Sequence, residues 1–341
     1  MLGLSNGLMY QGTPSGIDPL APITIDDCIG WWDFTDSTTM WIDGRPSSGF
    51  PYYNLLPPAN PVSSDDDEFD RIDNKAWTLQ SNTSNALGKW LAGSNTFYKT
   101  GGANGYSYVK FSGLGARVYN FGYASGESGI GDSIDNEWDG DQTVDMSSYN
   151  GSHPLSQSTI DLADFTIFLV ADAYHSDGRA FSIFGDKTDP TDDASRKEFH
   201  LYYDKTSTTA GQYKMDCYDG TTTTTINSGT TGKSDNLHII TGVLSGSGDS
   251  KLYRDGDNTD GTTSASSGSG SIDLTTGQGE DRILIGRNMN LGASSDSTAG
   301  VTSWSWHPNG RIYEIICYDR ELTSEELSTI ETHLKEKYGI S

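Results

Sequence analysis

The second half of the chain contains short apolar segments separated by turn residues, and this pattern constrains the fold more than any other feature. The segments lie at residues 165–173, 180–186, 197–204, 212–220, 237–246, 250–258, 281–287 and 310–320. Those at 197–204 and 212–220 alternate apolar and polar residues, as half-buried antiparallel strands do. Short strands at this spacing predict an all-β fold, either a sandwich or a barrel.

Composition and length agree with one large sheet domain. The 341 residues include 18 Tyr, 8 Trp and 40 Gly, which suits strands joined by many turns. Residues 23–341 are therefore predicted to form a single sandwich, with a loop insertion near 113–160 where Gly, Ser and Asp are frequent. Earlier strands are expected at Ile29–Phe34, Ala76–Gln80 and Tyr106–Phe111.

The chain ends with the pattern of one amphipathic helix. Thr323 and Glu326 form a capping box, in which the Thr hydroxyl covers an exposed backbone N–H and the Glu carboxylate reaches back. Apolar residues then recur at helical spacing, and Gly339 ends the helix. The apolar positions are Leu327, Ile330, Leu334 and Tyr338. We expect this helix to pack on the sandwich after the final strand.

Residues 309–339 resemble the closing strand and helix of concanavalin A-like, laminin G-like jelly-roll domains found in viral and bacterial proteins. Such domains tend to end with a Gly-Arg-Ile-x-Glu strand, an Arg-x-Leu-(Ser/Thr)-x-x-Glu helix start and a Lys-Tyr/Trp-Gly finish. The matching residues are Gly310, Arg311, Ile312, Glu314, Tyr318, Arg320, Leu322, Thr323, Glu326, Lys337, Tyr338 and Gly339. The resemblance covers 160–341 and, more loosely, 27–112. It implies an antiparallel jelly-roll β-sandwich in which these residues hold the fold, with Arg320 fixing the helix to the sheet edge.

The charge balance excludes two classes of partner. The chain carries 22 Lys and Arg against 47 Asp and Glu, which gives a net charge of -25. A surface this acidic repels phosphate backbones, so binding to nucleic acid is not expected. It also disfavours anionic membranes, and no apolar run in the sequence is long enough for insertion as a transmembrane helix.

Residues 1–22 are predicted to form an extended N-terminal arm. Apolar side chains alternate there with Gly, Ser and Asn, and three prolines follow. The apolar residues are Leu2, Leu4, Leu8, Met9 and Tyr10. The alternatives are a floppy terminus and an anchor that docks on a partner or a neighbouring copy, and the apolar content favours the anchor. The start lacks the basic and apolar regions of a secretory signal.

Catalytic motifs are largely missing from the sequence. Retaining glycoside hydrolases need two carboxylates close together, and the nearest match, Glu-Trp-Asp-Gly-Asp-Gln at 137–142, lacks the final Glu. HExxH and P-loop motifs do not occur. Cys28, Cys217 and Cys317 lack the spacing of a zinc site or a disulfide framework. We therefore predict no catalytic residue and no cofactor.

One acidic cluster is a candidate calcium site. Asp255, Asp257 and Asp260 resemble the start of an EF-hand loop, but their spacing is off by one and no Glu follows in the twelfth position. The alternative is a solvated turn, since the Asp-Gly pair at 255–256 favours a tight hairpin.

Three aromatic and polar residues are candidates for glycan contact. Trp304, Trp306 and His307 precede the final strand, and the spacing of the two Trp places both rings on one side of an extended segment. Burial in the core or in a hydrophobic interface is the alternative.

These features together favour a virion structural protein of a tailed phage. A capsid decoration protein or another surface component of the virion is expected, anchored through its arm and assembled in the host cytoplasm. Its partners would be other virion proteins and further copies of itself. A glycan-binding module for host attachment, which would bind surface glycans, is the alternative, and a glycoside hydrolase is the third hypothesis.

Overall fold

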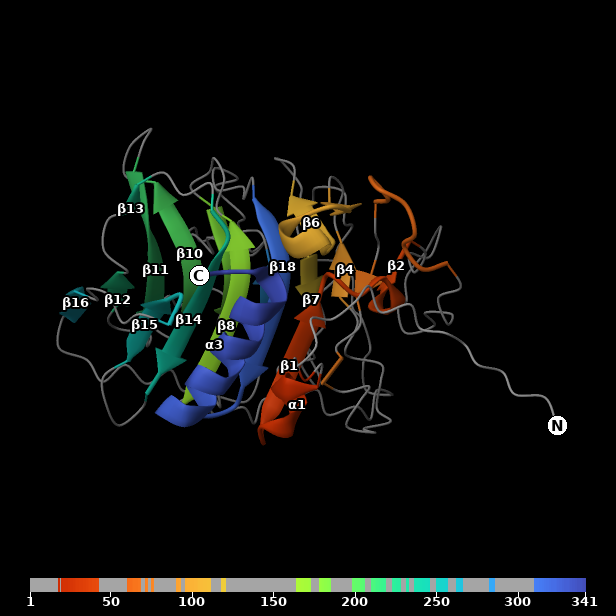
Figure 1. The fold of residues 1–341 in the computed structure, drawn as a ribbon. Coiled ribbons are helices and arrows are strands. Elements are labelled where there is room, and N and C mark those ends of the chain that lie inside the picture. The colour runs from red at the N-terminus through yellow and green to blue at the C-terminus, as the bar shows by residue number, and fades with distance from the viewer. Residues whose placement is uncertain are drawn as a thin grey trace, which may run out of the picture.

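Two antiparallel sheets face each other, and a C-terminal helix covers one of them on the side turned away from the other sheet (Figure 1). This arrangement is taken from a computed structural model. The residues that the structure describes are 18, 20–42, 60–68, 71–72, 75–76, 90–92, 96–111, 118–120, 164–172, 178–184, 198–205, 210–218, 223–227, 231–232, 236–245, 250–256, 262–265, 282–285 and 310–341.

The sheet beneath the helix is called the helix-side sheet. In spatial order its strands are β15 (Lys251–Arg254), β14 (His238–Leu244), β8 (Phe165–Asp172), β18 (Arg311–Tyr318), β6 (Tyr108–Phe111) and β5 (Thr96–Lys99). The first strand, β1 (Cys28–Asp33), pairs with β18, the last. The two ends of the chain are therefore joined within one sheet.

The opposite sheet is called the outer sheet. Its strands in order are β16 (Thr262–Ala265), β12 (Thr223–Asn227), β11 (Ala210–Tyr218), β10 (Glu198–Lys205), β9 (Gly178–Phe184), β17 (Arg282–Ile285), β7 (Val118–Asn120), β4 (Trp90–Ala92), β3 (Arg71–Ile72) and β2 (Met40–Trp41), and β13 (Thr231–Gly232) pairs with β11. The short helices are α1 (Ala21–Thr24), η1 (Ser37–Thr39) and η4 (Ala103–Gly105). The prediction of an antiparallel β-sandwich with one C-terminal helix is confirmed.

An apolar core fills the space between the two sheets. Inward side chains of both sheets contribute to it, and their burial follows the two-residue period of a strand. Its members include Trp32, Phe34, Ile167, Leu169, Leu201, Tyr213, Met215 and Ile315. The inter-sheet core therefore draws on strands from both halves of the sequence.

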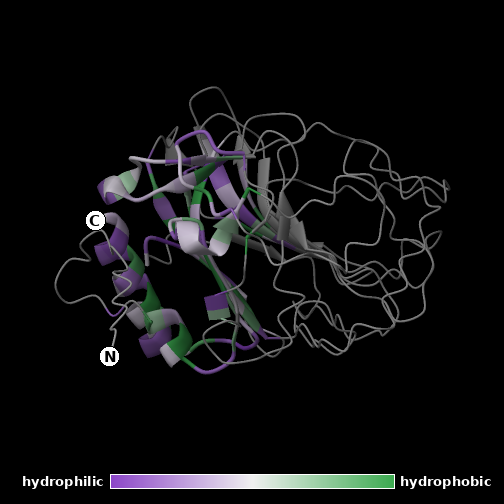
Figure 2. Cartoon of the chain, turned by 90° about the vertical axis from the view of Figure 1, so that its right-hand side faces the viewer, coloured by the Kyte–Doolittle hydropathy of each residue, from purple (hydrophilic) through white to green (hydrophobic). Residues whose placement is uncertain are grey.

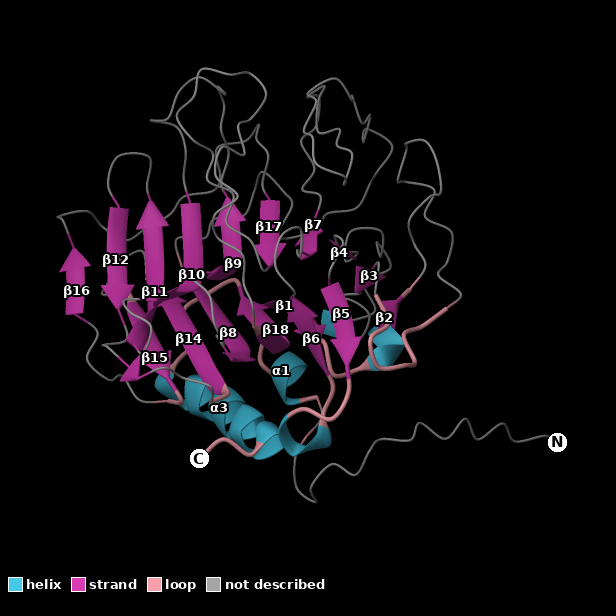
Figure 3. Cartoon of the chain, turned by 90° about the horizontal axis from the view of Figure 1, so that it is seen from above, coloured by secondary structure: helices cyan, strands magenta, loops and turns pink. Residues whose placement is uncertain are grey.

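A second core lies between the helix-side sheet and helix α3 (Ser324–Tyr338) (Figure 3). The four apolar positions predicted for the helix are all buried in it, and Figure 2 shows the hydrophobic side of α3 turned towards the sheet. Thr323 and Glu326 form the predicted capping box, and Gly339 ends the helix with a left-handed φ of 69°. The sequence pattern of this helix is therefore confirmed from start to end.

A β-bulge in β18 decides which side chains face the helix. Ile312 pairs with Ala171 while Glu314 pairs with Val170, so Tyr313 is an extra residue in the strand. After the bulge, the alternation of side chains between the two faces of the strand is shifted by one residue. Ile312, Ile315 and Cys317 belong to the inter-sheet core, whereas Glu314 is directed to the helix side.

Some elements differ from the sequence-based expectations. Ala76, predicted to begin a strand, lies with Lys75 in a helical turn, and 77–80 fall outside the described residues. Asp255 and Gly256 have the positive φ of a tight turn, 53° and 81°. The next described strand, β16, nevertheless pairs in the opposite sheet, so this turn does not close a hairpin.

Two predicted segments lie mostly outside the described residues. The insertion near 113–160 includes β7, which pairs with β4 and β17, and the rest of the insertion stays a prediction. The N-terminal arm before residue 18 also stays a prediction. Ala21 and Pro22, expected to end the arm, instead begin α1, because proline fits the first turn of a helix. Within the part of the chain that is described, no helix is long and apolar enough to cross a membrane.

Candidate functional site

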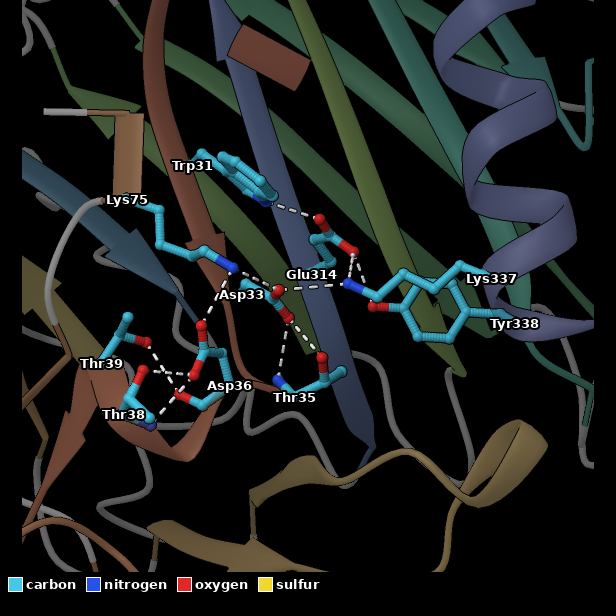
Figure 4. Close-up of polar contacts among 10 residues, drawn as sticks. All are labelled: Trp31, Asp33, Thr35, Asp36, Thr38, Thr39, Lys75, Glu314, Lys337 and Tyr338. Carbon is cyan, nitrogen blue, oxygen red and sulfur yellow. Dashed lines mark hydrogen bonds and ion pairs between the residues drawn. The ribbon is translucent and has the colours of Figure 1, made fainter. Parts of the chain in front are cut away.

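A cluster of charged groups is buried where β1, β18 and α3 meet (Figure 4). Glu314 is its centre and is fully buried. Its Oε1 accepts a hydrogen bond from Trp31 Nε1 at 2.6 Å. Its Oε2 accepts from Lys337 Nζ at 2.7 Å and from Tyr338 OH at 2.6 Å. One carboxylate therefore joins the first strand and the last helix to the last strand.

Asp33 extends the cluster on the side of β1. Its Oδ1 accepts from the backbone N–H and the hydroxyl of Thr35, at 3.0 and 2.5 Å. Its Oδ2 accepts from Lys75 Nζ at 2.9 Å and from Lys337 Nζ at 3.2 Å. Lys75 also lies 4.3 Å from the centre of the Trp31 ring. We call Trp31, Asp33, Lys75, Glu314, Lys337 and Tyr338 the buried charge cluster.

Two carboxylates balance two ammonium groups in this cluster. Burial alone would raise the pKa of Asp33, but the charges of Lys337 and Lys75 outweigh it and hold that pKa below its ordinary value. Burial would likewise lower the pKa of Lys337, and the Asp33 and Glu314 carboxylates raise it instead. Asp33 and Lys337 therefore stay in their charged forms over the ordinary pH range.

The cluster acts as a fold element. Asp33 is 4% exposed and Glu314 0%, and both lie beneath the end of α3, so a substrate cannot reach them. The closing motif of this sequence thereby has a physical explanation, because its Glu314, Lys337 and Tyr338 are hydrogen-bonded to one another here. Asn104 of η4 adds a cap, since its side-chain amide donates to the carbonyl of Lys337 at 3.1 Å.

Arg320 fixes the start of α3, as the sequence predicts. Its two terminal nitrogens donate to the two oxygens of Glu326 at 2.8 and 2.7 Å. Its Nε lies 3.3 Å from a carboxylate oxygen of Asp27, beside β1. Hydrogen bonding to Arg320 lowers the pKa of Glu326 to about 2. The capping carboxylate is therefore charged at neutral pH.

A different group of polar side chains lies on the far side of the molecule, on the outer sheet. Along β10, β11 and β12, half-buried side chains alternate with the buried ones of the inter-sheet core. Side chains on this face are Tyr202, Gln212, Lys214, Asp216, Thr225 and Asn227. We call this set the polar outer face. It combines an aromatic ring, a carboxylate, an ammonium group, two amides and a hydroxyl.

Hydrogen bonds hold the centre of the polar outer face in place. Asp216 Oδ2 accepts from Tyr202 OH and Asp216 Oδ1 accepts from Thr225 Oγ1, both at 2.7 Å. Lys214 is opposite Tyr202 on one side and opposite Asn227 on the other. Asn227 Oδ1 is buried and accepts no hydrogen bond from any residue that the structure describes. Such a face can stack a ring against Tyr202 and exchange hydrogen bonds with several hydroxyl groups.

The site residues predicted from the sequence belong to neither of these two clusters. The anchor residues Leu2, Leu4, Leu8, Met9 and Tyr10, and the aromatic group Trp304, Trp306 and His307, lie outside the described residues. The glycan and anchor assignments for these residues therefore stay predictions.

Only Asp255 of the predicted calcium site is described. Its Oδ1 accepts from the backbone N–H of Ile239 at 2.8 Å, and its Oδ2 lies 2.6 Å from His238 Nδ1. These contacts suit a turn that ties β15 to β14. Asp257 and Asp260 lie outside the described residues, so the calcium site stays a prediction. Among the side chains that are described, no three His, Cys, Asp or Glu residues gather as a metal site would require.

Sequence reasoning missed both clusters. The signal for the polar outer face was present, because 197–204 and 212–220 were predicted as alternating strands with one polar side. Their pairing was not predicted, so the polar residues of the two strands could not be placed side by side. Only the closing motif pointed to the buried charge cluster. That motif includes Glu314, Lys337 and Tyr338 but not Asp33 or Lys75.

Comparison with known proteins gives distant similarities only. No family model matches this sequence, and no curated protein sequence is significantly similar to it. Among solved structures, the chain is similar to Trypanosoma rangeli sialidase in complex with 2,3-difluorosialic acid, with a TM-score of 0.47 and 11% identity, over 94% of this chain and 36% of the sialidase. It is also similar to the Ruminococcus gnavus IT-sialidase CBM40 bound to alpha2,3 sialyllactose, with a TM-score of 0.36 and 16% identity, over 51% of this chain and 84% of that domain.

The chain spans about a third of the length of the sialidase structures. Both TM-scores lie below 0.5, so these similarities carry no conclusion about fold or function.

We expect Glu314→Gln to lower the free energy of unfolding by about 3 kcal/mol, because Lys337 would be left with a single carboxylate partner, Asp33. Chemical denaturation measures this change. Glu321→Gln, at a half-exposed carboxylate, is the matched control and is expected to cost less than about 0.5 kcal/mol. A double variant with Lys337→Met should recover part of the loss. Equal costs for the two single variants would contradict a structural function for the cluster.

Acid should weaken the buried charge cluster in a defined pH range. The pKa of Asp33 is lower in the folded chain than its ordinary value of 3.8, so its stabilising effect is present above that value and is lost as the pH falls below it. The difference in unfolding free energy between the wild type and Asp33→Asn is therefore expected to be constant near neutral pH and to shrink below about pH 4. Urea titrations at several pH values test this. A difference that stays constant through the acid range would show that Asp33 is not held as an ion pair.

Proposed function

We propose that this protein is a glycan-binding module and that its ligand binds to the polar outer face. The observation that carries the proposal is the hydrogen-bonded group of Tyr202, Asp216 and Thr225 on the side of the outer sheet that faces away from the core. Buried strands on both sides hold these side chains in place. A preformed group of this kind loses little conformational freedom when a ligand binds.

The chemistry of the polar outer face suits a polyhydroxylated ligand. Sugar rings present C–H groups on one face and hydroxyl groups at the edge, so they need an apolar surface beside donors and acceptors. Tyr202 supplies the apolar surface. The Asp216 carboxylate is a hydrogen-bond acceptor, and the amide of Gln212 offers a donor and an acceptor. The proposal is for binding without hydrolysis.

The layer order supports presentation of this face to a ligand. Helices α1 and α3 lie on the far side of the helix-side sheet, opposite the outer sheet (Figure 3). The N-terminal segment therefore leaves the sandwich at the helix side. An attachment made through that segment would leave the polar outer face directed away from the point of attachment.

Replacing Tyr202 with Ala should weaken glycan binding about tenfold or more, because the ring that carries the stacking contact is removed. An array of neutral and sialylated oligosaccharides identifies the ligand, and calorimetry with the best oligosaccharide measures the loss. Tyr253→Ala, at a half-buried tyrosine packed on the helix side, is the matched control and should leave the affinity unchanged. Asp216→Asn should weaken binding while keeping the fold.

The outcomes separate the function from the site. Absence of binding to any oligosaccharide would refute glycan binding. If Trp306→Ala abolished binding and Tyr202→Ala did not, the polar outer face would be the wrong site.

We propose a second function, which is compatible with the first: the chain is a surface component of a tailed-phage virion, anchored through its N-terminal arm. The position of α1 on the helix side favours this proposal, since an arm that begins there can reach a neighbouring protein without covering the polar outer face. The net charge of -25 would also keep free copies apart before assembly.

Mass spectrometry of purified virions tests the virion proposal. Peptides of this chain are expected in the particles, and deletion of residues 1–17 should remove them while the sandwich still folds. Absence of the full chain from purified particles would refute the proposal.

A further inference from the structure

Helix α3 contains a buried histidine that makes no hydrogen bond. His333 is 6% exposed, and neither of its ring nitrogens has a hydrogen-bond partner among the described residues. Buried polar groups are usually paired, and an unpaired one destabilises the fold. A neutral imidazole can stay buried without hydrogen bonds at a modest cost in folding free energy. A protonated imidazole has two N–H donors and a charge, and it needs acceptors that the described residues do not supply at this position.

The N-terminal segment is docked beside this histidine. We call Asp18 and residues 20–27 the docked segment. Helix α1, within this segment, packs on α3 (Figure 1), and Ile25 is buried in the core beneath the helix. Polar contacts tie it to the end of β18 and the residues that follow. Tyr318 OH donates to the carbonyl of Pro22 at 2.8 Å, and the backbone N–H of Asp319 donates to the carbonyl of Asp27 at 3.0 Å. Arg320 contacts the carbonyl of Asp26 at 3.4 Å and the carboxylate of Asp27 at 3.3 Å.

Charged groups from four elements face His333. Lys337 lies one turn later on α3, Glu314 is on β18, Asp33 is on β1 and Asp18 precedes α1. The Glu314 and Asp33 carboxylates already accept hydrogen bonds within the buried charge cluster. Asp18 is different, because its side chain is exposed and its Oδ1 accepts from the backbone N–H of Leu20.

We propose that His333 makes docking of the N-terminal segment depend on pH, so that protonation of the imidazole releases the docked segment from α3. Release exposes the ring to water and satisfies both N–H donors. The docked segment contains only a four-residue helix, α1, so it can open locally without unfolding of the sandwich.

The direction of the effect follows from linkage. Burial lowers the pKa of His333 below its ordinary value of 6.5, and Lys337 lowers it further, while the three carboxylates raise it. The docked state therefore binds the proton more weakly than the released state. Docking is stable above pH 6.5 and weakens as the pH falls below that value. This range lies above the one in which Asp33 becomes protonated, so the two effects can be measured separately.

Asp18 provides a second test of the same mechanism. Its negative charge favours the protonated imidazole in the docked state and so opposes release. Asp18→Asn removes the charge and keeps the side-chain oxygen that accepts from Leu20. Release should then begin at a higher pH than in the wild type.

Hydrogen exchange of the full chain tests the proposal, with mass spectrometry of peptides covering residues 20–27. Between about pH 7.5 and about pH 5, protection of these amides, corrected for intrinsic exchange, should fall about tenfold or more in the wild type. His333→Leu should show no such fall, because its side chain does not titrate. Thr332→Ala, at the exposed neighbouring position, is the matched control and should behave as the wild type does. His333→Gln provides a polar, non-titrating variant if the Leu variant does not fold.

Two results would overturn the proposal. The first is the same pH-dependent loss of protection in the wild type and in the non-titrating variants. The second is a simultaneous loss of protection in β8, which would indicate unfolding of the whole sandwich. The test uses no glycan and no virion, so its outcome is independent of the proposed functions.

Discussion

The carboxylate of Glu314 is the contact on which the rest of the fold depends. It binds Trp31, which is 283 residues away in the sequence, and it also binds Lys337 and Tyr338 at the end of the last helix. Apolar side chains could fill the same space in several helix registers. Each of these hydrogen bonds instead has one donor and one acceptor, so the position of α3 on the sheet is defined. The β-bulge at Tyr313 makes this possible, because it turns Glu314 away from the inter-sheet core.

The three-layer order separates two kinds of surface. On the helix side, the buried charge cluster, the capping contacts of Arg320 and the docked segment all stabilise the joined ends of the chain. On the outer sheet, the side chains of the polar outer face are directed away from the inter-sheet core. Tyr202 and Asp216 lie outside that core, whereas Glu314 is fully buried between the sheet and α3. The proposed binding and the proposed anchoring use opposite faces for this reason.

Local features of the fold could be predicted because their physical causes are local. The capping box at Thr323 and the apolar spacing of α3 depend on residues within a few positions of one another. The β-bulge was not predicted, because the uneven spacing with which Ile312, Ile315 and Cys317 enter the inter-sheet core appears only in the tertiary structure. The predicted strand Ala76–Gln80 was wrong at its first residue, because Lys75 and Ala76 form a helical turn that brings the Lys75 ammonium to Asp33.

The sequence by itself determined that the chain forms short antiparallel strands, that it closes with one capped helix and that its surface is strongly acidic. Strand order and register were decided only in the tertiary structure. They bring Asp33 to Lys337, set Asp216 between Tyr202 and Thr225, and bury His333 beside the N-terminal segment. The physical reason is that periodicity specifies which side of a strand or helix is buried, whereas partners distant in the chain are selected by the packing of the whole molecule.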